Sequence, residues 1–555
     1  TTQQGKEEMF LSQENRYIAC SDNFAKIPGA PVAYWVSDIE RAEYLKGEVL
    51  EKYAKPCKGI DTGENDYFLR LWYEVKYYEL DFKKAVGRWI PYNKGGEYRK
   101  WYGNREYVLK WNGSSNELES RLAWKSKKPT LRNRDFWFRE GFSWGTVSSA
   151  NISARYTPEG CLFDNGGCTV FSNSYLYKVG ALINGIVGSR YLAFLAPTLN
   201  FQPGCIAKIA FNQNICQENE IDEFVSTNIS LSKSDWDAFE TSWDFTKHPL
   251  LRNKLTISEA YAEWEAECNA RFAQLKANEE ELNRIFINIY GLQDELTPEV
   301  EDKDVTVRKA DLQRDIKSLL SYAVGCMFGR YSLDVEGLAF AGGTWDDSKY
   351  VTFKPDEDNV IPITDEDYFE DDIIGRLIAW LKVVYGAETL EENLRFIADA
   401  LGTSGDTARQ KIRNYFLKDF FKDHCKIYQK RPIYWLYDSG KQNGFKALIY
   451  MHRYDADTSG QVRAEYLGKM EETYESEINR MQDIMDNGAG REVALAGKRK
   501  EKLQKQLHEC RDYDAVLGHI ALASIAIDLD DGVKVNYVKV QTAKDGKLLP
   551  ILAKI

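Results

Sequence analysis

The chain has 555 residues, more than one hydrophobic core usually serves, so we expect about three domains. Its hydrophobic share of 43% and charged share of 28% are those of an ordinary soluble globular protein, and no apolar run approaches the roughly 18 residues of a membrane span. The formal net charge of −12 argues, as an average, against a nucleic-acid partner.

Cysteine usage and the N-terminus predict a cytoplasmic protein. The ten cysteines form no CxxC pair, and the closest two, Cys161 and Cys168, have no second pair or histidine nearby, which favours free thiols over zinc or disulfides. The N-terminal sequence TTQQGKEEMF is polar and does not resemble a signal peptide. It also lacks an initiator methionine, which indicates a longer parent protein.

Residues 1–250 are predicted to form a β-rich domain. Short β-branched and aromatic runs alternate with glycine-rich turns, as in residues 27–37 (IPGAPVAYWVS) and 92–111 (YNKGGEYRKWYGNREYVLKW). The glycines of residues 179–191 (VGALINGIVGSRY) lack the spacing of a nucleotide-binding turn. We interpret them as packing positions.

One segment of this domain reverses the charge of the chain. Residues 83–155 contain sixteen lysines and arginines against six acids, a net charge of +10. The segment overlaps residues 134–167, which mix arginines, aromatics, hydroxyl residues and glycines. Because a basic surface with aromatic side chains suits phosphates and base edges, we expect one positive face on an acidic protein.

Residues 251–460 are predicted to be a helical domain. Apolar residues recur at helical spacing for about nine turns over residues 257–292, and two further helices are expected in residues 314–333 and 371–386. Asp406 is the expected cap of the next helix, after which residues 433–455 predict a strand, a glycine turn and a strand. The domain should therefore close with a small hairpin.

Residues 461–555 are predicted to form a helical arm followed by C-terminal strands. Two amphipathic stretches within residues 462–520 meet near residues 487–490, which indicates an antiparallel helix pair. Residues 527–535 (IDLDDGVKV) lack the closing Glu of a calcium loop, so we interpret them as a strand, a turn and a strand. The three segments together predict an α+β fold.

Two functions other than nucleic-acid recognition are considered. Asp66 followed by Glu74 and Lys76 is an arrangement by which nucleases hold magnesium, although an ordinary strand with a wet charged face explains the same pattern. The acidic run at residues 364–372 is better read as a solvated helix start than as a cation site. Alternatively, the helical arm makes the chain a protein-interaction scaffold.

Eight motifs in one order carry a resemblance to a known family. The chain resembles the C-terminal half of PglX-type adenine-specific DNA methyltransferases of BREX phage-defence systems, which are related to single-chain type II restriction-modification enzymes. The motifs occupy residues 27–37, 58–75 (KGIDTGENDYFLRLWYEV), 140–167, 234–250 (SDWDAFETSWDFTKHPL), 283–300, 321–334 (SYAVGCMFGRYSLD), 424–455 and 528–540. The resemblance implies that residues 1–250 are a target-recognition domain.

In that family an N-terminal domain binds S-adenosylmethionine and flips the adenine, and the C-terminal half recognises the DNA sequence. The family's Asn-Pro-Pro-Tyr motif is absent here, since no two prolines are adjacent, and so is a glycine motif for the cofactor. We therefore expect the methyltransferase domain to lie upstream of Thr1. This chain alone is predicted to be non-catalytic and to hold no cofactor.

The resemblance directs the DNA interface to the basic, aromatic stretch. Arginines suit phosphates and guanine edges, and hydroxyl groups suit the DNA backbone, while Trp144 is either a wedge or core. The expected DNA-binding residues are Lys125, Arg132, Arg134, Arg139, Ser143, Trp144, Ser148 and Arg155. The expected partners are double-stranded DNA, the methyltransferase domain and other defence-system proteins, with no membrane.

Overall fold

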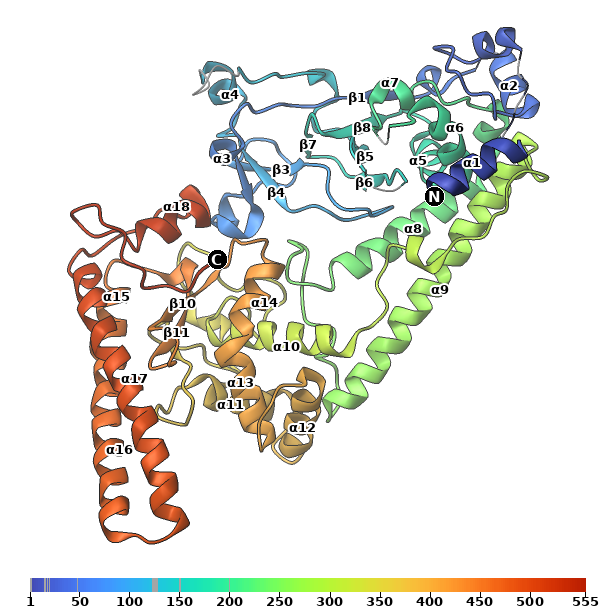
Figure 1. Ribbon diagram of the computed structural model, residues 1–555. Helices are drawn as coiled ribbons and strands as arrows, with labels where there is room; N and C mark the ends of the chain where they lie inside the picture. The colour runs from blue at the N-terminus through green and yellow to red at the C-terminus, as the bar shows by residue number, and fades with distance from the viewer. Residues whose placement is uncertain are drawn as a thin grey trace. The chain divides into compact units, whose positions relative to one another are not determined.

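The computed structural model describes residues 2–13, 16, 18, 20–46, 48–121, 128–148, 151–198 and 200–555. The fold is α+β, as predicted, with helices and small sheets (Figure 1). The chain divides into two compact units: unit 1 comprises Thr1–Leu69, Asp81–Trp236 and Ala270–Arg308, and unit 2 comprises Arg70–Leu80, Asp237–Asn269 and Lys309–Ile555. No helix in the described part of the chain has the length and apolar character needed to cross a membrane.

Two four-stranded sheets are built from the β-rich part of the sequence. The first has the order β1-β8-β5-β6 with antiparallel neighbours, and the second has the order β2-β4-β3-β7, in which β3 pairs antiparallel with β4 and parallel with β7. The strands are β1 (Lys55–Cys57), β2 (Leu69–Leu71), β3 (Trp89–Asn93), β4 (Tyr107–Lys110), β5 (Gly141–Gly145), β6 (Arg155–Thr157), β7 (Leu162–Phe163) and β8 (Gly167–Phe171). All residues of β3 and β8 are buried, so these strands are covered on both faces.

Helices pack on the first sheet and complete the core of unit 1. A Cβ on Gly180 would lie 2.6 Å from the ring of Phe142, and one on Gly188 would lie 1.9 Å from the carbonyl oxygen of Leu182, so the glycines are packing positions, as predicted. The helices of unit 1 before α9 (Ile257–Tyr290) are α1 (Gln3–Ser12), α2 (Asp38–Leu45), α3 (Asn65–Phe68), α4 (Asn116–Ser120), α5 (Leu176–Asn184), α6 (Ile186–Leu195), α7 (Pro203–Ile206) and α8 (Glu220–Trp236). Of these, α1 has no buried residue, and Phe68 of α3 and Leu118 of α4 pack in the core of the second sheet.

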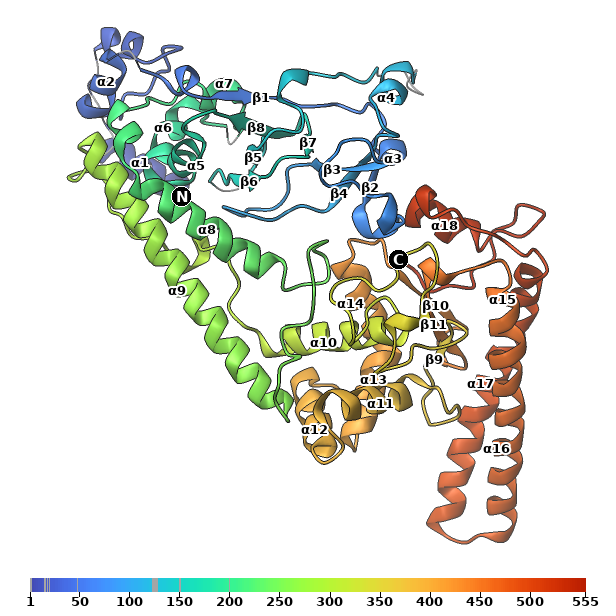
Figure 2. The ribbon, with the colours of Figure 1, turned by 180° about the vertical axis from the view of Figure 1, so that it is seen from behind.

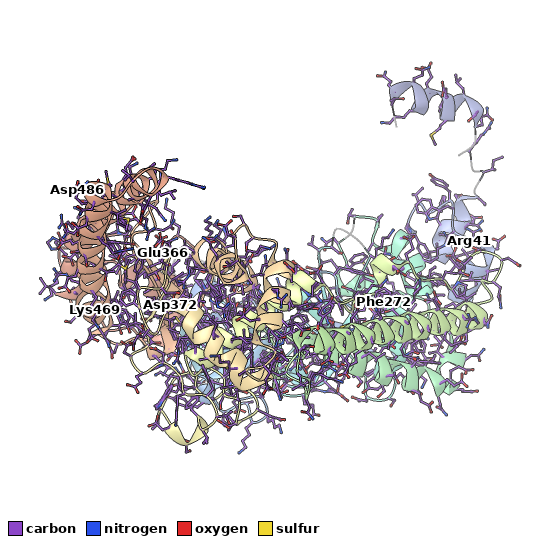
Figure 3. All side chains as sticks on the ribbon, turned by 90° about the horizontal axis from the view of Figure 1, so that it is seen from below. Arg41, Phe272, Glu366, Asp372, Lys469 and Asp486 are labelled. Carbon is purple, nitrogen blue, oxygen red and sulfur yellow. The ribbon has the colours of Figure 1, made fainter. Side chains whose placement is uncertain are left out.

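Helix α9 (Ile257–Tyr290) confirms the predicted long helix. Its residues up to Asn269 belong to unit 2, and those from Ala270 onward belong to unit 1. Phe272, labelled in Figure 3, joins Leu275 and Leu282 in the core of unit 1. The three contiguous domains predicted from the sequence therefore differ from the two units, whose segments interleave along the chain.

Unit 2 contains the helices expected in residues 314–333 and 371–386. The helix expected after Asp406 is divided into two, and the helix of residues 390–401 was not predicted. Asp372 caps α11 by accepting hydrogen bonds from the amides of Ile374 and Gly375, which accounts for acids at that helix start. The expected cap Asp406 is wrong by one residue, because the Thr407 hydroxyl accepts from the Gln410 amide. The helices are α10 (Leu312–Met327), α11 (Ile373–Tyr385), α12 (Leu390–Leu401), α13 (Ala408–Lys418) and α14 (Phe420–Ile427).

The predicted hairpin and arm are both present in unit 2. Strands β10 (Tyr434–Asp438) and β11 (Lys446–Tyr450) pair antiparallel, and β9 (Ile361–Pro362) extends the sheet beside β11. Short helix α15 (Thr458–Gln461) and a π-helical turn lead into α16 (Gly468–Asn487), which runs antiparallel to α17 (Arg491–Ala521) (Figures 1 and 2). The turn between the two helices lies between Asn487 and Arg491, as the glycines of the sequence predicted.

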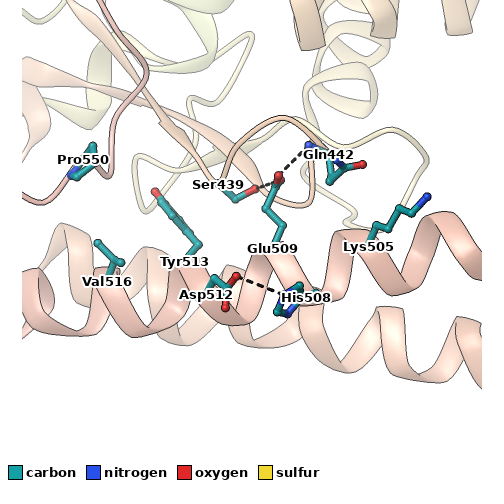
Figure 4. Close-up of a pocket in the computed structure, with 9 residues that line it drawn as sticks. All are labelled: Ser439, Gln442, Lys505, His508, Glu509, Asp512, Tyr513, Val516 and Pro550. Atoms are coloured by element: carbon teal, nitrogen blue, oxygen red, sulfur yellow. Dashed lines mark hydrogen bonds and ion pairs between the residues drawn. The ribbon is translucent and has the colours of Figure 1, made fainter.

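The base of the arm is fixed to the hairpin turn. The Glu509 carboxylate on α17 accepts hydrogen bonds from the Ser439 hydroxyl and the Gln442 amide, both at 2.8 Å (Figure 4). It also accepts one from the Gly444 amide at 3.0 Å. Nearer the start of α17, Arg499 pairs with Glu366, which is labelled in Figure 3. The acidic run at residues 364–372 thus pairs with the arm as well as starting a helix.

The C-terminal segment differs from its prediction. Residues 529–531 form a 3₁₀ turn and α18 (Gly532–Lys539) follows, so the expected strand, turn and strand over residues 527–535 is wrong. The Asp528 side chain accepts from the Asp530 amide, and Gly532 has a φ of +75°. Asp528 therefore caps the 3₁₀ turn, and Gly532, at positive φ, begins the helix that follows in place of a hairpin.

Candidate nucleic-acid interface

The predicted DNA-binding residues divide into exposed and buried groups. Arg132, Arg134 and Arg139 are exposed, and Ser148 is partly exposed. Lys125 lies outside the described residues. The exposed arginines remain candidates for contact with DNA, whereas the buried members need another explanation.

Ser143 and Trp144 lie in the interior of unit 1, so the predicted DNA contact of Ser143 is wrong, and Trp144 is core, the second of its two expected roles. Ser143 is 3% exposed, and its hydroxyl lies 2.9 Å from that of Thr157 and 2.8 Å from that of Thr169. Trp144 is fully buried and donates to the Phe201 carbonyl at 2.8 Å. Both belong to β5, whose residues from Gly141 to Trp144 are buried.

Arg155 is also buried, at 4% exposed, so the predicted phosphate contact is wrong. Its guanidinium donates to the carbonyls of Gly95 and Arg99, at 3.1 and 3.4 Å. Burial, and secondarily the neighbouring Arg99, lowers the pKa of Arg155 to about 10, so the side chain stays charged at neutral pH. Arg155 therefore supports the chain between Gly95 and Arg99 from inside.

Two other cations of the +10 segment are neutralised by acids far away in the sequence. Arg99 pairs with Asp235 at 2.7 Å, and Lys100 pairs with Glu279 at 2.9 Å. Burial opposes protonation of Lys100, but Glu279 outweighs it and raises the lysine pKa. The positive face expected from the local charge count is therefore smaller than predicted.

Three loops of unit 1 meet at the ends of β3, β5 and β7, and we call them the three-loop surface (residues 94–97, 145–148 and 164–167). A Cβ on Gly167 would lie 2.5 Å from the Gly95 amide nitrogen, so only glycine permits this approach. The Thr146 amide donates to the Gly166 carbonyl at 2.9 Å. The loops are thus joined backbone to backbone.

The three-loop surface presents a cation, an apolar side chain and polar groups. Val147 is 76% exposed at the tip of its loop. The Lys94 ammonium lies 4.9 Å from the centre of the Tyr107 ring. Arg132 donates to the Asn165 side chain at 2.8 Å, which connects an exposed arginine to the third loop.

Arg134 and Arg139 lie beside the aromatics of the same stretch. The Arg134 guanidinium lies 5.3 Å from the Trp137 ring and pairs with Glu119 at 2.9 Å. Arg139 lies 5.3 Å from the Phe136 ring and donates to the Asn173 side chain at 2.5 Å. Because Arg134 has a carboxylate partner, Arg132 and Arg139 are the better phosphate ligands of the three.

Lys94, Val147 and Asn165 of the three-loop surface are not among the predicted DNA-binding residues. The signal that could have found them is the recurrence of short glycine turns: NKGG at residues 93–96, WGT at 144–146 and DNGG at 164–167. Each turn follows a strand, but only the sheet pairing brings them to one place. The geometry suits hydrogen bonding and charge contact with a nucleic acid.

The nuclease alternative is contradicted by the surroundings of Glu74. This carboxylate is 3% exposed and accepts from the amides of Leu71 and Val533, at 2.9 and 3.0 Å. Burial raises its pKa, which the two amides and Arg431 counter. Lys76 lies 3.7 Å from Glu79, and no group of three or more potential metal ligands occurs among the described residues.

A cofactor cradle does not fit the glycine turns of unit 1. The turn after β3 leads to β4, whereas a dinucleotide or S-adenosylmethionine cradle needs a strand, a glycine turn and a helix N-terminus. In the part of unit 1 that the structure describes, the glycine turns therefore lack the helix N-terminus that such a cradle supplies.

No family model matches the chain. The curated proteins to which it is similar are adenine-specific methyltransferases. It is 43% identical over 580 residues to the adenine-specific methyltransferase PglX of Lacticaseibacillus casei strain Zhang, which covers 99% of this chain and 48% of that protein. It is 37% identical over 555 residues to the adenine-specific methyltransferase BrxX of Escherichia coli O9:H4 strain HS, covering 93% and 45%. The chain therefore spans about half the length of these relatives.

Proposed function

We propose that this chain recognises double-stranded DNA on behalf of an adenine-specific DNA methyltransferase of a BREX-type defence system. The observation that carries the proposal is the three-loop surface, where glycine turns bring Lys94, Val147 and the Arg132–Asn165 pair together. Backbone contacts fix the register of a protein on DNA, and side chains at the loop tips read base edges. Similarity to two adenine-specific methyltransferases supplies the chemistry that recognition would serve.

In this proposal, methyl transfer and S-adenosylmethionine binding belong to a part of the protein that this chain does not span. The support is the poor fit of the glycine turns to a cofactor cradle and the coverage of about half of each relative. We assign the helical arm to contact with other proteins of the defence system, because α16 and α17 extend away from the hairpin (Figure 1).

The test is a salt titration of duplex affinity for the wild type, Arg132→Ala and Arg139→Ala. Each phosphate contact that is lost should weaken binding to all duplexes alike and lower the slope of log affinity against log salt by about 1. Arg480→Ala is the matched control, because Arg480 is an exposed arginine of the arm and pairs with Glu477. It should leave both affinity and slope unchanged.

The thermal midpoint of each variant should equal that of the wild type, because both arginines are exposed. Unaltered affinity and slope in Arg132→Ala and Arg139→Ala would remove the DNA-facing assignment of this stretch. A loss confined to one preferred sequence, of about 1–3 kcal/mol, would instead identify the arginine as a base reader.

A further inference from the structure

Unit 2 contains a pocket of about 520 Å³ that the proposed function does not use. It is lined by Tyr77, Tyr78, residues 338–344 and Lys349. Tyr78 is 63% exposed, so a large aromatic ring stands open at the pocket. Pockets of this size accommodate small ligands.

The glycine loop of the pocket is fixed against the aromatic residues. The Tyr77 amide donates to the Ala341 carbonyl at 3.1 Å. Gly342 and Gly343 have φ values of +84° and +96°, and a Cβ on Gly343 would lie 3.0 Å from the Tyr78 ring. A side chain at either position would strain the backbone, so the loop requires glycine to pass beside the ring.

Hydrogen-bond donors and a positive charge complete the pocket. Gly343 and Thr344 are exposed, and in the described part of the chain their amides make no hydrogen bond. The Lys349 ammonium is anchored by donating to the Ala339 carbonyl at 3.0 Å. A lysine and open amides are the donors that a phosphate group accepts from in proteins.

We propose that this pocket binds one nucleotide, with its base stacked on Tyr78 and its phosphate bonded to the amides of Gly343 and Thr344 and to Lys349. The inference rests on the proposed function, because we take the bound nucleotide to be an unpaired nucleotide of the recognised DNA. Stacking on an aromatic ring accepts every base, and a paired base does not expose its face. The pocket therefore selects unpaired nucleotides rather than a sequence.

The experiment measures the affinity of the wild type, Tyr78→Ala and Tyr78→Phe for a short single-stranded oligonucleotide and for a duplex. Loss of one stacking contact should weaken single-strand binding by about 5- to 150-fold in Tyr78→Ala. Tyr78→Phe keeps the ring and should bind within about twofold of the wild type. Duplex affinity should change little in either variant.

Two further variants separate the pocket from general effects. Thr344→Pro removes one amide donor and should also weaken single-strand binding. Tyr34→Ala is the matched control, because Tyr34 is a tyrosine of unit 1 with 45% exposure, and it should bind as the wild type does. Thermal midpoints establish that each variant is folded.

A competition with free dAMP identifies the source of the nucleotide. Displacement of the oligonucleotide by dAMP from the wild type assigns the pocket to free nucleotides as well, and resistance to dAMP assigns it to nucleotides within a strand. Unchanged single-strand affinity in Tyr78→Ala would overturn the proposal. If the wild type binds single strands but no duplex, the proposed function fails while the pocket stands.

Discussion

At the scale of the residue, position relative to the sheet decides what an arginine does. Arg132 and Arg155 come from the same basic segment, yet Arg132 is exposed and Arg155 is 4% exposed. Arg155 starts β6 in the interior, where it supports the Gly95 and Arg99 carbonyls. A buried arginine of this kind shapes the recognition surface without touching a ligand.

Glu240 makes a residue-scale prediction about pH. Burial raises the pKa of Glu240 to about 7. Arg330 and the hydrogen bonds from Tyr428 and Ser321 lower this pKa but do not outweigh burial. Since an unfolded glutamate releases its proton near pH 4.5, the folded state binds more protons between pH 4.5 and 7. The contribution of Glu240 to stability is therefore largest at low pH and falls as pH rises through this window, by at most about 1.4 kcal/mol per pH unit.

The measurement is the urea midpoint of unfolding from pH 5 to 8 for the wild type and Glu240→Gln. The variant should lose part of the decline in stability toward pH 8. Burial and the neighbouring Asp358 also raise the pKa of Asp356 to about 7. Asp356 should therefore account for the part of the decline in stability that remains in the variant. Identical pH dependence in the two proteins would show that Glu240 does not titrate in this range.

At the scale of the element, one carboxylate attaches the arm to the hairpin turn. Glu509→Ala removes the acceptor of three hydrogen bonds, and we expect the local opening free energy of residues 439–446 to fall by about 1.5–3 kcal/mol. Hydrogen exchange of this segment is the readout. Glu501→Ala, on the same helix, removes an exposed pair with Lys505 and should leave the exchange of this segment unchanged.

Protection of residues 439–446 that is equal in Glu509→Ala and the wild type would mean that packing alone holds the arm. The alternative contact is present: the Tyr474 hydroxyl of α16 donates to the Gly444 carbonyl at 2.8 Å. A Cβ on Gly444 would lie 2.7 Å from the Gln506 carbonyl oxygen, so the turn also approaches α17 closely.

At the scale of the whole molecule, the chain passes repeatedly between its two units, and neither unit is one continuous segment.

We expect the isolated chain to bind no S-adenosylmethionine, because its glycine turns connect strands or join loops instead of starting a cofactor-binding helix. Isothermal titration calorimetry with the cofactor is the check. Saturable heat at micromolar concentration would place a cofactor site in this chain.

The sequence by itself determined the class of fold, the long helix α9, the hairpin and both helices of the arm. These follow from local rules: helical spacing persists over many turns, and glycine turns interrupt it at defined places. The motif order likewise predicted the similarity to adenine-specific methyltransferases. The helix at Gly532 escaped prediction because a short segment contains too few turns to reveal its period.

Only the tertiary structure decided which basic residues reach the surface. Arg99 and Lys100 find their acids at Asp235 and Glu279, more than a hundred residues later in the chain. A local charge count cannot include such partners, because helices α8 and α9 bring them to the sheet only when the core forms. The same core formation joins three separate glycine turns into one surface, since strand pairing, not sequence proximity, determines which loops meet.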